Sequence, residues 1–138
     1  MLEPRKLKHR KVHRGRSDLK GIATRGNKVS FGTYGLKSIE SGELTPRQIE
    51  AARRVMTRYT KKGGKIWINI FPHKPVSKKA QEVPMGSGKG TLDHYVAAIK
   101  PGRVLFEMDG IPANSAKEAM ILASHKLPVK CKFINTED

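Results

Sequence analysis

The sequence predicts an α+β fold in which two helices pack on a mainly antiparallel sheet. Apolar residues recur with helical periodicity over 46–62 and 115–126, and strand-like patterns precede, separate and follow these two segments. The resulting order is neither a regular strand–helix alternation nor strands alone, which is typical of the α+β class. A length of 138 residues fits a single domain, 1–138, with one hydrophobic core.

The first 28 residues are predicted to form a basic extension ahead of the α+β body at 29–138. They hold ten Lys and Arg residues and few large apolar ones, so the segment cannot bury enough surface to offset its ordering entropy and should order on a polyanion. A solvated tail is the alternative, but the charge exceeds what solubility requires. The residues predicted to contact nucleic acid here are Arg5, Lys6, Lys8, Arg10, Lys11, Arg14, Arg16, Lys20, Arg25 and Lys28. His9 and His13 are crowded by these cations, so we predict no metal site.

A short strand is predicted over 29–36, and a helix over 46–62 follows it. Thr45 and Gln48 form a capping box around Pro46, and Gly63-Gly64 should end the helix. One face of this helix is apolar and carries Ile49, Ala52, Met56 and Tyr59. The opposite face carries Arg47, Arg54, Arg58 and Lys61. Because Glu50 is the one acid in the helix, we favour a phosphate-facing surface over ordinary solvent exposure.

Three isoleucines alternate with Trp67, Asn69 and Phe71 over 65–71, which predicts a strand. Trp67 and Phe71 could stack on nucleic-acid bases, as they do in single-strand binders. Packing in the core is favoured instead, because the chain has only four Phe, three Tyr and one Trp.

A long basic loop is predicted at 72–90, with three prolines, three glycines and four lysines against one acid. Connections of this length are uncommon in compact domains and are usually functional or disordered. Glycine lets a backbone approach a ligand closely and lysine brings charge without fixed geometry, so we expect the loop to meet an anionic partner. Its tip is Met85, Gly86, Ser87, Gly88, Lys89 and Gly90.

The last third of the chain is predicted to contain two strands, a helix and a final strand. The strands 94–100 and 103–109 are joined through Pro101-Gly102, which favours a type II turn and hence a connection wider than two residues. Ser115 and Glu118 should cap a helix that runs to about 126, since Pro128 prevents its continuation. Its apolar stripe is Ala116, Ala119, Met120, Ala123 and Leu127, widened by Ile121 and Leu122. The alternation of Val129, Cys131 and Phe133 with lysines predicts the final strand.

Charge and composition restrict the class of partner. Lys and Arg number 28 and Asp and Glu 12, a net charge of +16, so nucleic acid is the expected partner. The excess lies within the first 90 residues. Cys131 is the only cysteine, which excludes an internal disulfide and a cysteine-based zinc site. No apolar run approaches the roughly 18 residues of a membrane span, and we predict no membrane partner.

Enzyme interpretations fail on the spacing of their motifs. The stretch 86–90 resembles part of a phosphate-binding loop, but Val83 stands where that motif needs glycine and Gly90 where it needs serine or threonine. Glu107 and Asp109 are paired carboxylates, which we interpret as exposed charges on one face of a sheet. No serine has the surroundings of a nucleophile elbow. We therefore predict no enzyme, no catalytic residues and no cofactor.

Several blocks of the sequence, in combination, resemble the bacterial-type large-subunit ribosomal protein L-sixteen family over nearly the whole chain. They are Met1-Leu2-Glu3-Pro4-Arg5-Lys6, His13-Arg14-Gly15-Arg16, Gly26-Asn27, Phe31-Gly32-Thr33-Tyr34-Gly35-Leu36, Gln48-Ile49-Glu50-Ala51-Ala52-Arg53, Trp67-Ile68 with Phe71-Pro72, Met85-Gly86-Ser87-Gly88-Lys89-Gly90 and Lys126-Leu127-Pro128-Val129-Lys130.

The resemblance implies a structural constituent of the large ribosomal subunit, located in the ribosome of the cytoplasm or of an organelle that encodes it. It implies large-subunit rRNA, tRNA and neighbouring large-subunit ribosomal proteins as partners. Residues 5–25 and the arginines of the first helix would contact rRNA, and residues 85–90 would lie nearest tRNA, close to the A site and the peptidyl transferase region. Some family members have an arginine before the Met-Gly pair that can be hydroxylated. This chain has Pro84 there, so that modification is not expected.

A free-standing basic RNA-binding factor or a small RNA-acting enzyme is the alternative function. It would need its own binding platform or acid–base residues, and it would leave large subunits at moderate salt.

Overall fold

The computed structural model describes residues 21–60, 63–78 and 91–136. The chain forms an α+β fold, as predicted, and every strand pairing in the described part is antiparallel. The elements in order are β1 (Tyr34–Ser38), β2 (Gly42–Leu44), α1 (Pro46–Thr60), β3 (Lys65–Ile68), β4 (Lys74–Lys78), β5 (Thr91–Ile99), β6 (Val104–Asp109), α2 (Ala113–Ser124) and β7 (Cys131–Asn135). Residues 1–20 of the predicted extension and the loop tip at 85–90 lie outside the described residues.

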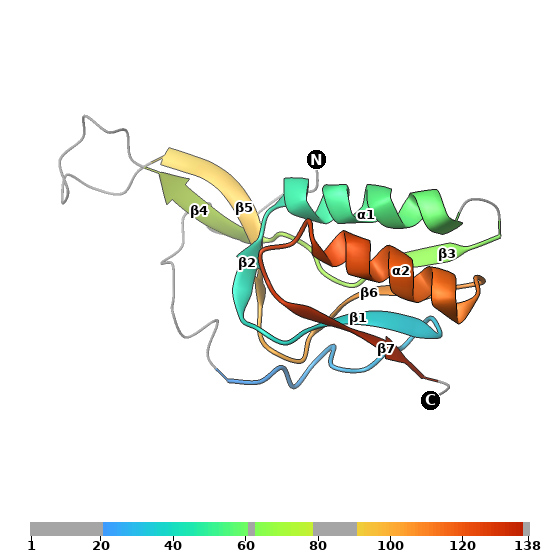
Figure 1. The fold of residues 1–138 in the computed structure, drawn as a ribbon. Coiled ribbons are helices and arrows are strands. Elements are labelled where there is room, and N and C mark those ends of the chain that lie inside the picture. The colour runs from blue at the N-terminus through green and yellow to red at the C-terminus, as the bar shows by residue number, and fades with distance from the viewer. Residues whose placement is uncertain (1–20, 61–62, 79–90, 137–138) are drawn as a thin grey trace.

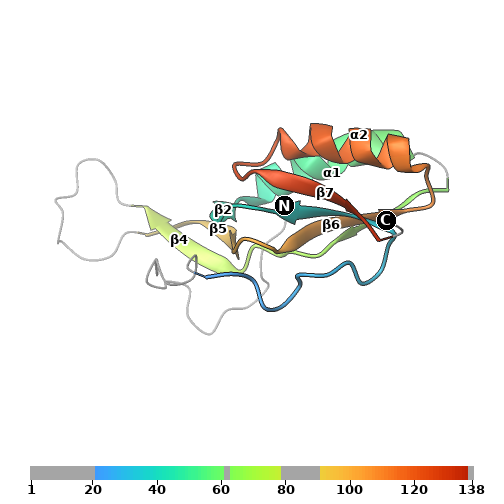
Figure 2. The ribbon, with the colours of Figure 1, turned by 60° about the horizontal axis from the view of Figure 1, so that its bottom comes forward.

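The strands form two sheets. One has four strands in the order β3-β6-β1-β7, and the other has three in the order β2-β5-β4. The two helices lie side by side on one face of the four-stranded sheet, and segment 21–33 runs across the opposite face (Figures 1 and 2). Strands β4 and β5 project from this body as a hairpin (Figure 1). The molecule therefore has a layered body with one extended arm.

The core lies between the helices and the central strand β6, whose residues Val104 to Met108 are all buried. Helix α1 contributes Ile49, Ala52 and Met56 to the core, and α2 contributes an alanine stripe with Met120. Leu44, Ala97 and Ile99 extend the same cluster into the three-stranded sheet. The two sheets thus share one hydrophobic core.

Local capping chemistry fixes the start of α1. The Gln48 amide donates to Thr45 Oγ1 at 3.2 Å, and the Thr45 amide donates to Gln48 Oε1 at 2.9 Å, so the predicted capping box is confirmed. Tyr59 is half-buried at the edge of the apolar face. The helix ends at Thr60, and Gly63 follows with a φ of +91° that favours glycine.

The predicted cap of the second helix is wrong. Pro112 is the N-cap of α2 and makes no side-chain capping bond, so Ser115 already lies inside the first turn. Glu118 instead accepts a hydrogen bond from Tyr59 Oη at 3.4 Å, which links the two helices. The buried alanine stripe is confirmed, whereas Ile121 and Leu122 are exposed and do not widen it. The helix ends at Ser124.

The strand predicted at 29–36 begins only at Tyr34 and continues to Ser38. Residues 29–33 are not in a strand, because the amides of Ser30, Phe31 and Gly32 are hydrogen-bonded to a side chain of β6. The strand predicted over 65–71 ends at Ile68, and the final strand covers Cys131–Asn135 in place of 129–133. Short strand β2 was not predicted.

The long loop predicted at 72–90 is shorter, because Lys74–Lys78 form strand β4. Pro75 lies within this strand and pairs with Tyr95. Proline cannot donate to a neighbouring strand, but β4 lies at the edge of its sheet, where one side needs no partner. The connection between β5 and β6 is wider than two residues, as predicted, and turns at Gly102, whose φ is +95°.

Candidate nucleic-acid interface

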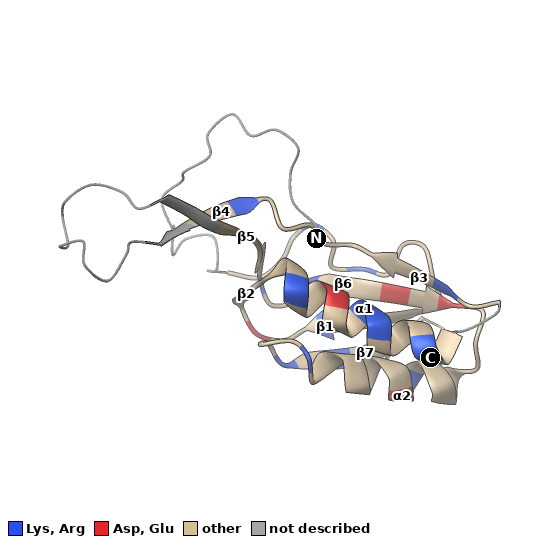
Figure 3. Cartoon of the chain, turned by 90° about the horizontal axis from the view of Figure 1, so that it is seen from above, with Lys and Arg blue, Asp and Glu red and all other residues tan. Residues whose placement is uncertain are grey.

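The arginine face of α1, defined by Arg47, Arg54 and Arg58, is exposed to solvent. Lys and Arg positions recur along this helix in Figure 3. Glu50 Oε1 lies 2.5 Å from Arg53 Nη2 and 3.5 Å from Arg54 Nε. The one acid of the helix is therefore paired with these two arginines. Arg53 lowers the pKa of Glu50, which is consistent with this pairing. Within the described part of the chain, Arg47 and Arg58 have no carboxylate partner at salt-bridge distance.

The position of Arg47 is informative. The first turn of α1 holds no acidic residue, and a positive charge there is unfavourable against the helix dipole. Arg47 therefore does not stabilise the helix electrostatically. Its side chain is exposed and available to a partner.

Arg25 and Lys28 lie on a different side of the molecule. Both are exposed and belong to segment 21–33, which crosses the sheet face opposite the helices (Figure 2). The structure thus separates the predicted cations that it describes into two groups on opposite faces. The other predicted site residues, 5–20, Lys61 and 85–90, lie outside the described residues.

A buried carboxylate holds segment 21–33 on the sheet. Glu107 Oε1 accepts hydrogen bonds from the amides of Ser30 at 2.9 Å, Phe31 at 2.7 Å and Gly32 at 2.9 Å. Asn69 Nδ2 donates to the other carboxylate oxygen. At Gly32 a Cβ atom would lie 2.6 Å from the carbonyl oxygen of Met108, so only glycine allows this approach.

The interpretation of Glu107 as an exposed charge on the sheet is therefore wrong, since its side chain is fully buried. Burial raises its pKa, but the hydrogen bonds from Gly32, Asn69, Phe31 and Ser30 outweigh burial and hold the pKa below its usual value. Asp109 is half-buried and accepts a hydrogen bond from Thr33 Oγ1 at 3.0 Å. Both carboxylates accept hydrogen bonds from segment 21–33 and hold it on the sheet.

The aromatic residues of β3 and the segment after it are less buried than predicted. Phe71 is 44% exposed, and half-buried Trp67 stacks on Phe31 outside the central core, with ring centroids 6.2 Å apart. Phe31 itself is 65% exposed. The prediction that Phe71 packs in the core is wrong, because the strand ends at Ile68 and the alternation of faces ends with it.

A hollow of about 570 Å³ opens where segment 21–33 meets the junction of the two sheets. We call it the basic hollow. It is lined by Ala23, Thr24, Arg25, Ile68, Asn69, Ile70, Phe71, His73, Ala97, Ala98, Ile99, Lys100 and Arg103. None of these lining residues is acidic. The basic hollow is thus a concave, positively charged site with an apolar floor.

Sequence reasoning singled out only Arg25 among the charged groups of the basic hollow. Arg103 lies in a predicted strand, and the last third of the chain is electrically balanced. No feature of the sequence therefore indicated that Arg103 belongs to a site. In the structure Arg103 Nη1 donates to the Arg25 carbonyl at 3.2 Å and Nη2 to the Asn69 carbonyl at 2.7 Å. A Cβ atom at Gly26, where φ is +65°, would overlap the guanidinium of Arg103. The Gly26-Asn27 pair can be seen in the sequence, but nothing in the sequence indicates that Arg103 packs against it.

The described residues offer little for catalysis or metal binding. Burial, with a smaller contribution from the charge of Glu40, raises the pKa of the Cys131 thiol to about 11, which makes it a poor nucleophile at neutral pH. No cluster of three or more His, Cys, Asp or Glu suited to a metal ion occurs in the described ranges. Neither α1 nor α2, the helices that the structure describes, has the length and apolarity to cross a membrane.

An α+β body with cations on two faces, a positively charged hollow and a projecting hairpin has the features expected of a protein that binds a polyanion. The family model described as ribosomal protein L16p/L10e matches residues 4–134 of this chain. The chain is also 56% identical to the large ribosomal subunit protein uL16 of Heliobacterium modesticaldum over 138 residues, which cover 100% of this chain and 94% of that protein.

The chain therefore belongs to the L16p/L10e family of ribosomal proteins. This confirms the resemblance drawn from its sequence blocks. A member of this family is a structural component of the ribosome, an RNA–protein particle that carries out translation, rather than a known enzyme.

Proposed function

We propose that this chain is a single-domain constituent of the large ribosomal subunit that holds rRNA on two basic faces and directs the β4–β5 hairpin toward tRNA. Residues 1–28 serve as an rRNA-binding extension of the body at 29–138. Neighbouring large-subunit proteins are further partners. The observation that carries the proposal is the match to the relative from the large subunit over the full chain.

The arginine face supports rRNA as the partner. Exposed cations that lack carboxylate partners among the described residues are suited to phosphate oxygens, which supply most of the affinity in protein–RNA complexes. The surface of α1 would position the body on the rRNA without reading sequence, because phosphates carry no sequence information.

The hairpin supports a second contact. Strands β4 and β5 extend away from the body, so the residues between their ends are joined to a stiff support at both sides (Figure 1). The tip residues 85–90 combine glycine with Lys89, which suits close backbone approach and attraction to phosphate. We propose that this tip contacts tRNA near the A site and the peptidyl transferase region.

Large subunits reconstituted with variants of the full chain test both contacts together. Arg47→Gln with Arg58→Gln should release the protein during a salt wash that retains the unaltered chain, since two phosphate contacts are lost. Lys89→Glu should leave the protein on the washed subunits but reduce A-site tRNA affinity. The two readouts are retention after the wash and tRNA binding by the retained particles.

The matched control is Lys130→Gln with Lys132→Gln, which removes two exposed cations beside the outer strand β7. It should change neither readout. An unaltered chain that leaves washed subunits would contradict the role of subunit constituent. Normal tRNA binding by the Lys89 variant would contradict the tRNA contact alone.

A further inference from the structure

The basic hollow has features that the arginine face lacks. It is concave, it has an apolar floor, and its volume of about 570 Å³ lies in the range of small-molecule sites. A duplex presents phosphates on a convex surface and keeps its bases stacked inside. The hollow therefore suits a smaller group that carries both charge and a flat apolar surface.

One charge of the hollow, that of Arg103, is held in place by hydrogen bonds. Arg103 is half-buried and donates to the carbonyls of Arg25 and Asn69. Carbonyl oxygens accept these bonds but carry no full negative charge, so the guanidinium keeps its positive charge at the wall of the hollow. Arg25 is exposed, Lys100 is half-exposed, and both line the hollow. An anionic group is the complementary ligand.

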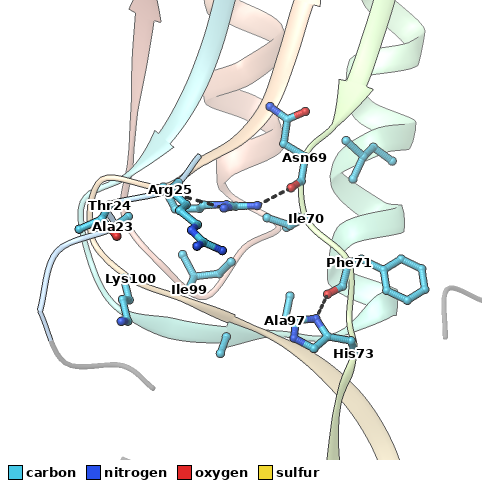
Figure 4. A pocket seen from close by; sticks show the side chains of 13 residues that line it. Ala23, Thr24, Arg25, Asn69, Ile70, Phe71, His73, Ala97, Ile99 and Lys100 are labelled. Carbon is cyan, nitrogen blue, oxygen red and sulfur yellow. Dashed lines mark hydrogen bonds between the residues drawn. The ribbon is translucent and has the colours of Figure 1, made fainter. Parts of the chain in front are cut away.

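The floor and the opposite wall suit an aromatic base. Arg25 lies at one side of the hollow and His73 at the other, with Ala97 and Ile99 between them (Figure 4). The small side chain of Ala97 leaves room for a flat ring. Histidine rings and arginine guanidinium planes are both surfaces on which unpaired RNA bases stack.

The His73 ring is oriented by the backbone. Its Nδ1 lies 3.1 Å from the carbonyl oxygen of Phe71. A carbonyl can only accept, so Nδ1 is the donor in this bond, and Nε2 of the neutral ring is left as an acceptor. An amino group of a base or a ribose hydroxyl could donate to that atom.

We propose that the basic hollow receives one unpaired nucleotide of the large-subunit rRNA. Its base lies on Ala97 and Ile99 beside the His73 ring, and its phosphate is held by Arg25 and Lys100. This assignment rests on the proposed function, since it presumes that the chain is bound to rRNA. The basic hollow would then recognise a single unpaired nucleotide, whereas the arginine face of α1 recognises only phosphates.

Base-specific chemical probing of reconstituted large subunits tests the site with the full chain in place. His73→Ala removes the stacking surface, and one nucleotide or a short run that the unaltered chain protects should become reactive. Loss of one base stack corresponds to roughly tenfold weaker occupancy of the site. His73→Phe keeps a ring and should retain the protection. Arg25→Gln with Lys100→Gln should expose the same nucleotide.

The control is again Lys130→Gln with Lys132→Gln, which should leave the reactivity unchanged. Equal rRNA reactivity in subunits with the unaltered chain and with the His73→Ala chain would overturn the assignment. That result would also be seen if the hollow held an acidic peptide of a neighbouring protein instead of a nucleotide. Loss of protection by His73→Phe as well would contradict stacking of the base on this ring. If Arg47→Gln with Arg58→Gln still weakens retention, the proposed function stands even when the nucleotide site fails.

Discussion

At the scale of single residues, Glu107 determines where the basic segment 21–33 lies. Its carboxylate is fully buried in the central strand and accepts hydrogen bonds from three consecutive amides of that segment. A buried carboxylate costs free energy unless it is well hydrogen-bonded, and hydrogen bonds to charged groups contribute about 1.5 to 3 kcal/mol each. Glu107 thus fixes residues 30–32, and Arg103 with backbone hydrogen bonds at Ala23 and Gly26 fixes the part of the segment around Arg25.

We expect Glu107→Gln to lower the free energy of unfolding by about 1 to 3 kcal/mol at neutral pH, because the charge-assisted bonds become neutral ones. The pKa of Glu107 is lowered in the folded state, so its stabilising contribution is complete above the ordinary value of 4.5 and is lost as the pH falls toward the folded-state pKa. The stability of the unaltered chain should therefore fall in this acid range more steeply than that of the variant.

Urea unfolding as a function of pH measures this difference. Asp109→Asn is the matched control, because Asp109 is two residues away on the same strand but is only half-buried. Parallel pH profiles for the unaltered chain and Glu107→Gln would contradict the role assigned to Glu107.

Glu107 also shows why some residue roles cannot be predicted from a sequence pattern. Its spacing from Asp109 indicates one strand face, which is correct, but the segment that covers that face lies more than seventy residues earlier in the chain. Arg103 and Gly26 repeat the point, since the guanidinium of Arg103 occupies the space that a Cβ atom at Gly26 would fill. Contacts between segments distant in sequence leave no local periodicity.

At the scale of elements, the β4–β5 hairpin is fixed at its base by an ion pair. Lys74 Nζ lies 3.4 Å from Glu43 Oε2, and the two side chains are 8% and 14% exposed. Lys74 is on β4 and Glu43 on β2, so the pair spans β5, the strand between them. The ion pair thereby joins the outer strand of the hairpin to β2, the hairpin's neighbour in the sheet.

We expect Lys74→Met to destabilise the protein by about 3 to 5 kcal/mol, because it removes the cation 3.4 Å from the buried Glu43 carboxylate. The double variant Lys74→Met with Glu43→Leu should recover most of this loss, since apolar residues can replace a buried pair. Thermal unfolding measures the change, and hydrogen exchange of the β5 amides measures opening of the hairpin. A loss below about 1 kcal/mol for Lys74→Met would show that the pair behaves like an exposed one.

The elements that were predicted correctly are those whose signals are local. Helix α1 begins where its capping box indicates, because Thr45 and Gln48 are only three residues apart. Strand β4 was missed because Pro75 argues against a strand, and only its position at a sheet edge makes proline acceptable. The cap of α2 was misplaced because a sequence-level capping box at Ser115 and Glu118 competed with Pro112, which has no side chain that can cap.

At the scale of the whole molecule, the cations face two directions. The arginine face of α1 lies on the helix layer, and Arg25 with Lys28 lies on the opposite side of the sheet (Figures 2 and 3). One RNA duplex cannot readily cover both layers of so small a body. The arrangement favours a protein placed between two rRNA segments, which the net charge alone could not indicate.

This arrangement predicts independent contributions from the two faces. Arg47→Gln with Arg58→Gln, and separately Arg25→Gln with Lys28→Gln, should each reduce the salt dependence of rRNA binding by the equivalent of up to two phosphate contacts, a slope change of about 0.7 to 0.9 per contact. The fourfold variant should show the sum, since sites on opposite layers share no partners. Binding constants at several salt concentrations give the slopes, and nucleotide protection maps should differ between the two double variants. Identical protection maps would mean that both faces meet the same RNA segment, and the bridging arrangement would then be wrong.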